Sequence, residues 1–357
     1  MASTGEDNRG FNILSGQPKR TSKRLVLSYV LDWGCIFLLA AAGAILYSIA
    51  GSNHVFSLDD PSLSYPLKSD TVSIVIVGIV CCAGPAILIV VTCLLLPLPW
   101  RLRLWELHAG WLGLGLSLAG AFFVTSGMKD VVGKPRPDLI ARCQPDLANI
   151  ATYAVGGLGL HREAAPVMVT SGICQNPDAK VVRDGFAAFP SGHSSFSWAG
   201  LLYLSLWLGA KFAISVPVRS VAVVSGVVRK TSYERSAATG APPLYLLLVV
   251  AIPTGGALYI CASRYNDYMH AGWDIMGGSL IGIVFAILGF LWYHAPAGQG
   301  YGGWAWGARS PSDAFGAGFA SDGFGEGREQ RGSRHDYEDI ELTAMDGSPT
   351  GLRVSHQ

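Results

Sequence analysis

The sequence predicts an all-α polytopic membrane protein, a bundle of six transmembrane helices flanked by disordered termini. Half of the 357 residues are hydrophobic, only 14% are charged, and the mean hydropathy is +0.36. Such a composition is too apolar for a soluble globular protein of this length. In addition, several apolar runs reach the roughly 20 residues that a helix needs to cross a bilayer. The six runs, with approximate bounds, are 26–49, 71–96, 105–127, 193–213, 243–262 and 272–292.

The two ends of the chain are polar. Residues 1–24 finish in a basic run, Lys19-Arg20-Thr-Ser-Lys23-Arg24, and are expected to form a disordered cytosolic arm. A specific site for anionic lipids is the alternative. Residues 293–357 are rich in Gly and Ser and are expected to form a disordered cytosolic tail. Its acidic stretch at 336–342 is interpreted as a solvated charge run, with a sorting or docking motif as the alternative.

The distribution of basic residues indicates an orientation in the membrane. Lys and Arg gather in the amino-terminal arm and in the loops at 97–104 and 214–242, so the positive-inside rule places these segments in the cytosol. Both termini are then cytosolic. Three loops face the lumenal or extracellular side: 50–70, 128–192 and 263–271. The net charge of +1 gives no indication of a nucleic-acid partner.

The 128–192 loop is unusually long, and connections of this length are commonly functional or disordered. Its middle, 138–184, is rich in Gly and Ala and is interpreted as a lid or insertion. The loop contains Cys143 and Cys174. In a non-cytosolic compartment a disulfide between these two cysteines is expected.

Charged residues gather in the stretch 263–274, between the last two apolar runs. Ionisable residues so close to membrane segments are usually functional. On a helix His270 and Asp274 would share one face, so Asp274 could accept a proton from the imidazole and fix its tautomer. Arg264 offers a planar fork for a phosphate or carboxylate. The alternative is that Arg264 reaches toward water, His270 is interfacial and Asp274 caps the last helix.

Two further clusters lie at the ends of the long loop. Lys129 and Arg136 follow the third apolar run and could bind an anion, or could simply form a basic membrane edge. Ser191, Gly192 and His193 precede the fourth run, where a helix amino terminus would offer free N–H groups to an anion. The alternative there is a serine helix cap beside an interfacial histidine. The predicted topology places all three clusters on one side of the membrane, which favours a single shared site.

Together the clusters resemble the three-part signature of the type-2 phosphatidic acid phosphatase superfamily. The matching residues are Lys129-x6-Arg136-Pro137, Pro190-Ser191-Gly192-His193 and Ser263-Arg264-x5-His270-x3-Asp274. The six-span layout resembles the lipid phosphate phosphatase branch of that superfamily, which includes the fungal diacylglycerol pyrophosphate phosphatases. The resemblance covers about 25–292, the membrane domain.

The resemblance implies a role for each matching position. His270 would attack phosphorus and form a phosphohistidine, with Asp274 orienting its ring. His193 would protonate the leaving oxygen and later help to activate water. The phosphate oxygens would be held by Lys129, Arg136, Ser191, the Gly192 amide and Arg264.

The expected activity is hydrolysis of a lipid phosphate, namely phosphatidic acid, diacylglycerol pyrophosphate or a relative, presented by the surrounding membrane lipids. The clusters contain no group of carboxylates for metal ions, so no metal and no other cofactor is expected. The membrane would be vacuolar, Golgi, endoplasmic reticulum or plasma membrane. Alternative activities are hydrolysis of isoprenoid pyrophosphates or sphingoid-base phosphates, and phosphoryl transfer to an acceptor other than water. A non-enzymatic transporter or receptor that binds an anion is the alternative from another class.

Overall fold

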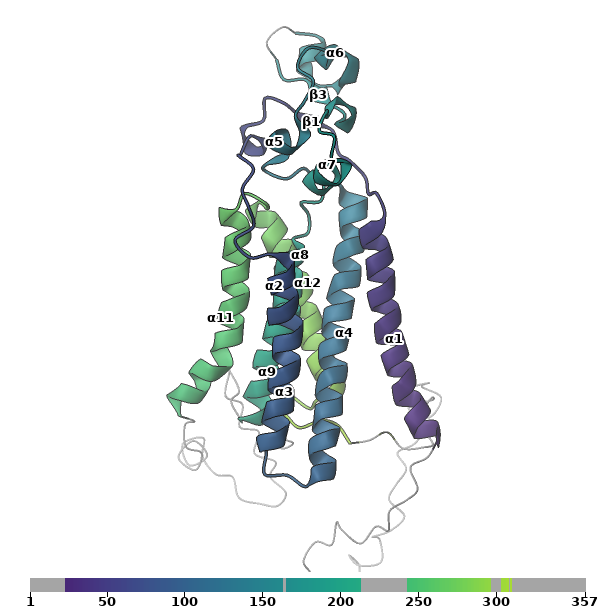
Figure 1. The fold of residues 1–357 in the computed structure, drawn as a ribbon, viewed down its shortest axis with the longest axis vertical. Helices are drawn as coiled ribbons and strands as arrows, with labels where there is room; N and C mark the ends of the chain where they lie inside the picture. Colours follow the sequence, from purple (N-terminus) through teal and green to yellow (C-terminus); the bar gives the residue numbers. More distant parts are fainter. Residues whose placement is uncertain (1–22, 163–164, 213–242, 297–302, 308, 310–357) are drawn as a thin grey trace, which may run out of the picture. The chain divides into compact units, whose positions relative to one another are not determined.

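The computed structural model describes residues 23–162, 165–212, 243–296, 303–307 and 309, and Figure 1 shows their arrangement. Nearly all of these residues belong to one compact unit, Val26–Ala308. Most of the predicted disordered ends and the predicted 214–242 loop lie outside the described residues.

Long apolar helices make up most of this unit, consistent with an integral, multi-pass membrane protein. Within the described ranges, five helices have the length and composition of a membrane span. They are α1 (Lys23–Ser48), α2 (Ile74–Gly78) continued through a π turn η2 (Ile79–Ala83) into α3 (Gly84–Leu95), α4 (Trp100–Val132), α11 (Leu244–Asn266) and α12 (Gly272–Tyr293).

The run at 193–213 differs from the other predicted spans. Its described part is helical, and consists of α8 (Gly192–Ser197), a π turn η5 (Trp198–Leu202) and α9 (Tyr203–Lys211). It is not among the five, because α8 begins with the polar sequence Gly-His-Ser-Ser. The structure therefore agrees with a polytopic helical protein but does not confirm the count of six spans.

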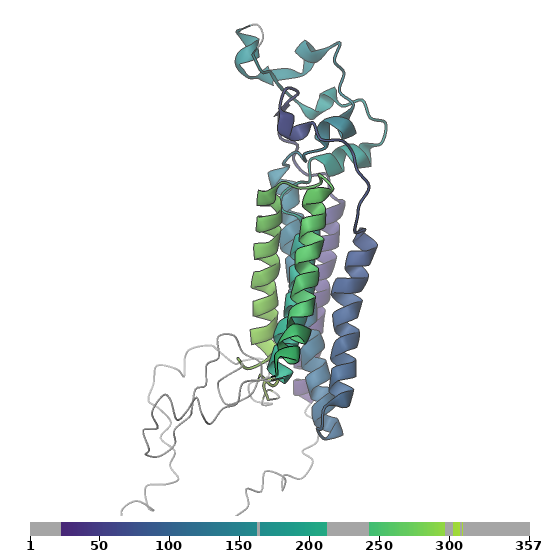
Figure 2. The ribbon, with the colours of Figure 1, turned by 90° about the vertical axis from the view of Figure 1, so that its left-hand side faces the viewer.

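The centre of the bundle is the pair α4 and α12, which run side by side (Figures 1 and 2). Their backbones approach closely at Gly113 and Gly289, where a Cβ on either glycine would overlap the carbonyl oxygen of the other. On the neighbouring α9, Tyr203 and Trp207 are fully buried, and the Tyr203 hydroxyl donates to the Gly110 carbonyl at 2.8 Å. This packing fixes the helix ends that carry the three clusters.

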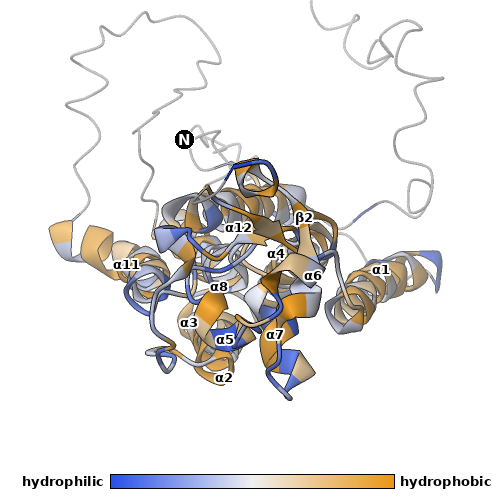
Figure 3. Cartoon of the chain, turned by 90° about the horizontal axis from the view of Figure 1, so that it is seen from above, coloured by the Kyte–Doolittle hydropathy of each residue, from blue (hydrophilic) through white to orange (hydrophobic). Residues whose placement is uncertain are grey.

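Apolar residues predominate along much of the long helices, as the hydropathy colours of Figure 3 show. Many of their side chains are exposed, as expected for contact with lipid. Large exposed examples occur on α1, α3, α11 and α12: Phe37, Leu38, Leu95, Ile252 and Trp292. Leucine and isoleucine fill the interior together with small and aromatic residues. The bundle is thus apolar inside and outside, which is the pattern of a membrane-embedded helix bundle.

A folded cap lies beyond one end of the helices (Figures 1 and 2) and is built from the 49–73 and 133–191 segments. It contains an antiparallel sheet of order β1-β3-β2. The strands are β1 (Phe56–Ser57), β2 (Ala154–Gly156) and β3 (Met168–Val169), and the helices are α5 (Leu139–Cys143), α6 (Ile150–Tyr153) and α7 (Ala179–Gly185), with short 3₁₀ turns η1 (Pro61–Leu63), η3 (Leu158–Leu160) and η4 (Ser171–Ile173). The fold is therefore mostly helical rather than all-α, because two separate loops pair as strands.

The cap has its own apolar core and a covalent link. Phe56, Leu139 and Ile173 are buried together within it. Cys143 and Cys174 form a disulfide, which confirms the predicted pairing. The disulfide holds α5 against the chain that leads to α7. The described part of 138–184, interpreted as a lid or an insertion, therefore has a defined structure.

Part of the predicted tail folds back onto the opposite end of the bundle. His294 and Ala305 form an isolated antiparallel bridge, and the Ala305 N–H donates to Glu106 at 2.7 Å. Lys211, at the end of α9, pairs with the same Glu106 at 2.6 Å. The segments 293–296 and 303–307, predicted to be disordered, therefore have defined positions; residues 310–357 lie outside the described part.

Candidate active site

The three clusters meet at one cavity of about 660 Å³, where the ends of the helices adjoin the cap. Six of the eight predicted site residues line it: Lys129, Arg136, Gly192, His193, Arg264 and His270. The other two, Ser191 and Asp274, are fully buried beside it. The packing of α4, α8, α11 and α12 thus brings together residues that are far apart in the sequence.

Lys129 lies in the last turn of α4, and Arg136 follows in the connection to the cap. A Cβ built on Gly192 would lie 3.8 Å from the Lys129 ammonium nitrogen, so this lysine lies beside the start of α8. Arg136 donates to Asp184 of α7 at 2.7 Å, and Arg142 donates to the other oxygen of that carboxylate at 3.0 Å. Burial alone would raise the pKa of Asp184, but the charges of Arg136, Lys129 and Arg142 hold it below its usual value.

Ser191 is the N-cap residue of α8, and its hydroxyl accepts the Ser194 N–H at 3.4 Å. Its own N–H donates to the Asp274 carbonyl at 2.9 Å, which ties the start of α8 to α12. The Ser191 side chain is therefore used as a helix cap in this structure. His193 points its Nε2 at the Val72 carbonyl, 3.2 Å away. The same Nε2 lies 3.5 Å from a terminal guanidinium nitrogen of Arg264. The carbonyl calls for a hydrogen on Nε2 and the guanidinium calls for a lone pair, so these two contacts favour different tautomers.

His270 lies in the short connection between α11 and α12 and is buried. Its Nδ1 donates to the Ala188 carbonyl at 2.7 Å, which fixes the tautomer and leaves a lone pair on Nε2. Burial, together with the charges of Arg136 and Lys129, holds the pKa of His270 well below its usual value. The ring is therefore neutral at neutral pH, as a nucleophile must be.

The expected hydrogen bond between His270 and Asp274 is replaced by other contacts. The oxygens of Asp274 accept the Ala271 N–H at 2.9 Å and the Lys134 ammonium at 2.6 Å. The physical reason is that α12 begins only at Gly272. His270 therefore precedes the helix, and the one-turn spacing of a continuous helix does not apply to the pair. Asp274 caps the first turn of α12 instead.

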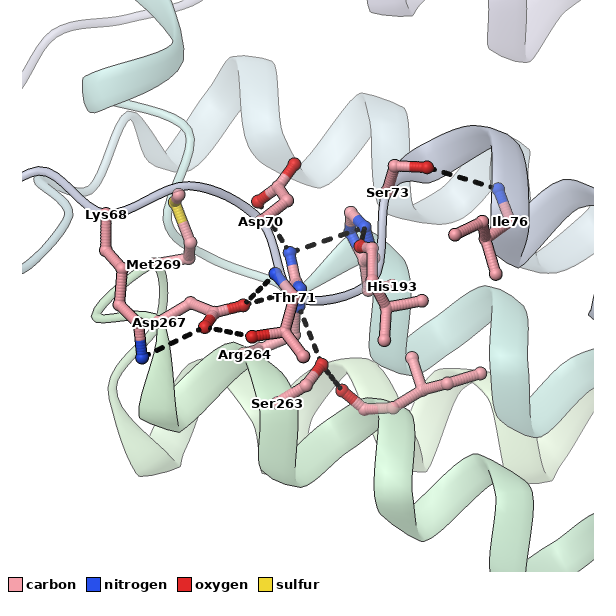
Figure 4. A network of polar contacts seen from close by, with 12 residues as sticks. Lys68, Asp70, Thr71, Ser73, Ile76, His193, Ser263, Arg264, Asp267 and Met269 are labelled. Carbon is pink, nitrogen blue, oxygen red and sulfur yellow. Dashed lines mark hydrogen bonds and ion pairs between the residues drawn. The ribbon is translucent and has the colours of Figure 1, made fainter.

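Arg264 is almost fully buried at the end of α11, and every nitrogen of its guanidinium has a partner (Figure 4). Nε donates to the Ser263 hydroxyl at 3.2 Å, and the two terminal nitrogens donate to Asp70 at 2.9 Å and Asp267 at 2.8 Å. Asp267 also accepts the Thr71 N–H at 2.8 Å and its hydroxyl at 2.6 Å. The 49–73 segment is thereby fastened over the site.

Several partners in the site carry no role in the sequence interpretation. Lys134 stands inside the first cluster, between the two residues predicted to bind phosphate. Arg142, Asp184 and Asp70 come from the cap, where only their neighbourhood in space reveals them. Within the described ranges, no group of three or more His, Cys, Asp or Glu is placed to hold a metal ion.

Comparisons with known proteins show the family of the chain. Residues 110–297 match the PAP2 superfamily. The chain is 30% identical to lipid phosphate phosphatase 2 of Arabidopsis thaliana over 267 residues, which cover 74% of this chain and 77% of the relative.

Two fungal proteins are also similar to this chain. Diacylglycerol pyrophosphate phosphatase 1 of Saccharomyces cerevisiae is 31% identical over 180 residues, covering 50% of each chain. The probable diacylglycerol pyrophosphate phosphatase 1 of Schizosaccharomyces pombe is 31% identical over 240 residues, 65% of this chain and 68% of the relative. No solved structure matches the chain. The family match spans more than half of the chain and confirms the resemblance to the superfamily, so this protein belongs to the PAP2 superfamily.

Proposed function

We propose that this protein is an integral membrane lipid phosphate phosphatase that hydrolyses phosphatidic acid, diacylglycerol pyrophosphate or both, through a phosphohistidine intermediate and without a metal ion. The observation that carries the proposal is the pairing of two imidazoles with cationic side chains in one cavity. Binding an anion needs only the cations and N–H groups. Two histidines, one buried and neutral and the other carrying an N–H, suit nucleophilic and acid–base chemistry.

The apolar part of the cavity supports a lipid substrate. Beyond the charged residues, its wall is formed by Tyr47 of α1, Ile74 of α2, Phe122 of α4 and Phe196 of α8. These residues belong to helices whose outer surfaces are apolar. A lipid could therefore keep its chains along the helices while its phosphate reaches the charged end. The plant and fungal relatives named for lipid phosphates and diacylglycerol pyrophosphate support the same substrate class.

The proposed reaction has two steps. Nε2 of His270 attacks phosphorus, the bond from phosphorus to the leaving oxygen breaks, and His193, which enters this step as the imidazolium, gives a proton to that oxygen and becomes neutral. Water, with His193 now accepting its proton, then attacks the phosphohistidine and releases phosphate, which restores both histidines. Ala188 holds His270 through its carbonyl, while Asp274 positions it indirectly by fixing the start of α12.

Fixed cations would supply the positive charge that a metal ion provides in other phosphatases. Lys129, Arg136 and Arg264 line the cavity together with the Gly192 backbone at the start of α8. The Ser191 hydroxyl would support this set as the cap of α8 rather than as a direct ligand unless its hydrogen bonds rearrange. Such an arrangement stabilises the transition state by preorganised charge.

The proposed topology has six spans, with α8, η5 and α9 as the fourth crossing, so that both termini are cytosolic. The Cys143–Cys174 disulfide supports placing the cap and the active site on the lumenal or extracellular side, since disulfides persist in oxidising compartments. Cysteine accessibility on either side of sealed vesicles tests this placement. Residues of the cap that react only from the cytosolic side would contradict it.

The decisive test is phosphate release from phosphatidic acid in mixed micelles, with EDTA in excess. Wild type is expected to be active, whereas His270→Ala should lose at least roughly a thousandfold in kcat. The matched control is His161→Ala, because His161 is an exposed histidine of the cap. Full activity of His270→Ala would reject the histidine nucleophile. A wild type that is active without EDTA and inactive with it would reject the metal-independent mechanism.

A substrate panel separates the related activities. Diacylglycerol pyrophosphate, an isoprenoid pyrophosphate and a sphingoid-base phosphate are compared with phosphatidic acid by kcat/KM. A kcat/KM more than tenfold higher for the isoprenoid pyrophosphate or for the sphingoid-base phosphate than for phosphatidic acid would replace the proposed substrate class. Trapping of ³²P on His270 after rapid acid-free quenching is expected in the wild type and not in His270→Ala.

A further inference from the structure

Arg264 cannot hold a phosphate in the arrangement that the structure shows. Its Nε donates to Ser263, one terminal nitrogen donates to Asp267, and the other donates to Asp70 at 2.9 Å (Figure 4). The nitrogen that faces Asp70 also lies 3.5 Å from Nε2 of His193. This nitrogen is the one directed at the proposed proton donor, so a phosphate oxygen between them has to compete with the Asp70 carboxylate.

Asp70 and Asp267 differ in what they do for Arg264. Asp267 has a fully buried side chain, and Thr71 fixes it with two hydrogen bonds, so it is a permanent partner. Asp70 has 41% of its side chain exposed and lines the cavity. Because Ser263 and Asp267 already orient the guanidinium, Asp70 is not needed to position it.

We propose that Asp70 is a displaceable counter-ion, which the substrate phosphate replaces on Arg264 and which thereby sets the affinity of the site for phosphate. Before substrate binds, the Asp70 carboxylate occupies the terminal nitrogen of Arg264 that Asp267 leaves free. When phosphate binds, Asp70 swings toward water, which its exposure allows. This inference rests on the proposed function, because it takes Arg264 as a phosphate-binding residue.

Removing the negative charge of Asp70 should strengthen anion binding. An ion pair with one partly exposed member is worth little, so the competition it imposes corresponds to an affinity change of about three- to tenfold. The proposal therefore predicts that Asp70→Asn binds orthovanadate and inorganic phosphate about three- to tenfold more tightly than the wild type. The KM for phosphatidic acid should fall with them, since the same competition is removed.

The test is isothermal titration of the full-length protein in detergent with orthovanadate and, separately, with inorganic phosphate. The matched control is Asp59→Asn, which removes an exposed carboxylate from the same segment and is expected to bind like the wild type. Asp70→Glu, which keeps the charge, is expected to stay close to the wild type. If Asp70→Asn does not fold, Asp70→Ser answers the same question.

Equal or weaker vanadate binding by Asp70→Asn would overturn the proposal, and weaker binding would make Asp70 a positioning residue. Equal strengthening by Asp59→Asn would also overturn it, since a general charge effect would then suffice. The titration needs no turnover. A wild type that binds vanadate but hydrolyses no lipid phosphate would therefore refute the proposed function while leaving the result on Asp70 intact.

Discussion

The buried pair Lys134–Asp274 gives the sharpest test of how the nucleophile is positioned. The ammonium lies 2.6 Å from one Asp274 oxygen, and the other oxygen accepts the Ala271 N–H at 2.9 Å. The Asp274 carbonyl accepts the Ser191 N–H at 2.9 Å. One aspartate therefore joins all three clusters of the signature. The substitution Lys134→Met keeps the length of the side chain and removes only its charge.

The expected cost follows from burial. Asp274 has 0% of its side chain exposed, so losing its counter-ion leaves a carboxylate buried without charge compensation. Breaking a fully buried pair costs about 3–5 kcal/mol. Because 38% of the Lys134 side chain is exposed, water already screens part of the interaction, and we expect about 2 kcal/mol. A shift of α12 would also move His270, so kcat should fall about 10- to 100-fold.

The assay is a double-mutant cycle with Lys134→Met, Asp274→Asn and the double variant, measured by unfolding in detergent and by kcat. Lys180→Met, at an exposed lysine of the cap, is the control and should change neither the unfolding free energy nor kcat. A coupling energy of at least about 1 kcal/mol is expected. Additive effects within about 0.5 kcal/mol would refute the reasoning. The reasoning would also be refuted if Asp274→Asn were inactive while Lys134→Met kept full activity. That pattern is expected if Asp274 orients His270 directly.

Three further predictions follow from the same packing. Gly278→Ala should reduce kcat strongly, because a Cβ at this position would overlap the Ser191 carbonyl. Gly272→Ala should leave kcat unchanged, because a Cβ there meets open space. Equal kcat values for the two variants would contradict this prediction. As the pH falls from 7.5 to 5, the wild type should lose more unfolding free energy than His270→Asn. The folded pKa of His270 lies below its unfolded value of about 6.5, so the unfolded state binds the extra proton; a parallel loss in both would count against it. Replacing both Cys143 and Cys174 by Ser removes a covalent link across 31 residues and should lower the unfolding free energy of the cap by about 3–4 kcal/mol. The variant should then be cleaved faster in the cap in limited proteolysis. Unchanged cleavage would argue against stabilisation of the cap by the disulfide.

The sequence was sufficient to predict most of what depends on local pattern. Runs of apolar residues located the long helices, because a bilayer demands that length. Lys129, His193 and His270 were placed in one site because motif and topology agreed. The fourth run was predicted as a span in the same way as the others, but its described helices are not among the five with the composition of a span. Its first turn carries polar residues of the candidate site, and these lower its hydropathy.

The partners of these residues were harder to predict, because they depend on how distant segments approach each other. The spacing of His270 and Asp274 suggested one helix face, but the helix starts between them. An acidic residue in the first turn is a helix-start signal, so the alternative that Asp274 caps the helix had a physical basis. The Ala188 carbonyl that holds His270 leaves no trace in residue type, because any residue provides a carbonyl.

This exchange of partners has an electrostatic consequence for the nucleophile. A carboxylate on His270 would favour the imidazolium and would add negative charge beside an incoming phosphate. The neutral carbonyl of Ala188 fixes the same tautomer and adds no negative charge. Its hydrogen bond raises the pKa of His270, but burial and the nearby charges of Arg136 and Lys129 lower that pKa further and keep the ring neutral. The acidic side chains are placed on cations instead, with Asp274 on Lys134, Asp184 on Arg136 and Asp70 on Arg264. In this arrangement a backbone group orients the proposed nucleophile, and half-exposed carboxylates pair with the two cavity arginines that are proposed to bind the phosphate.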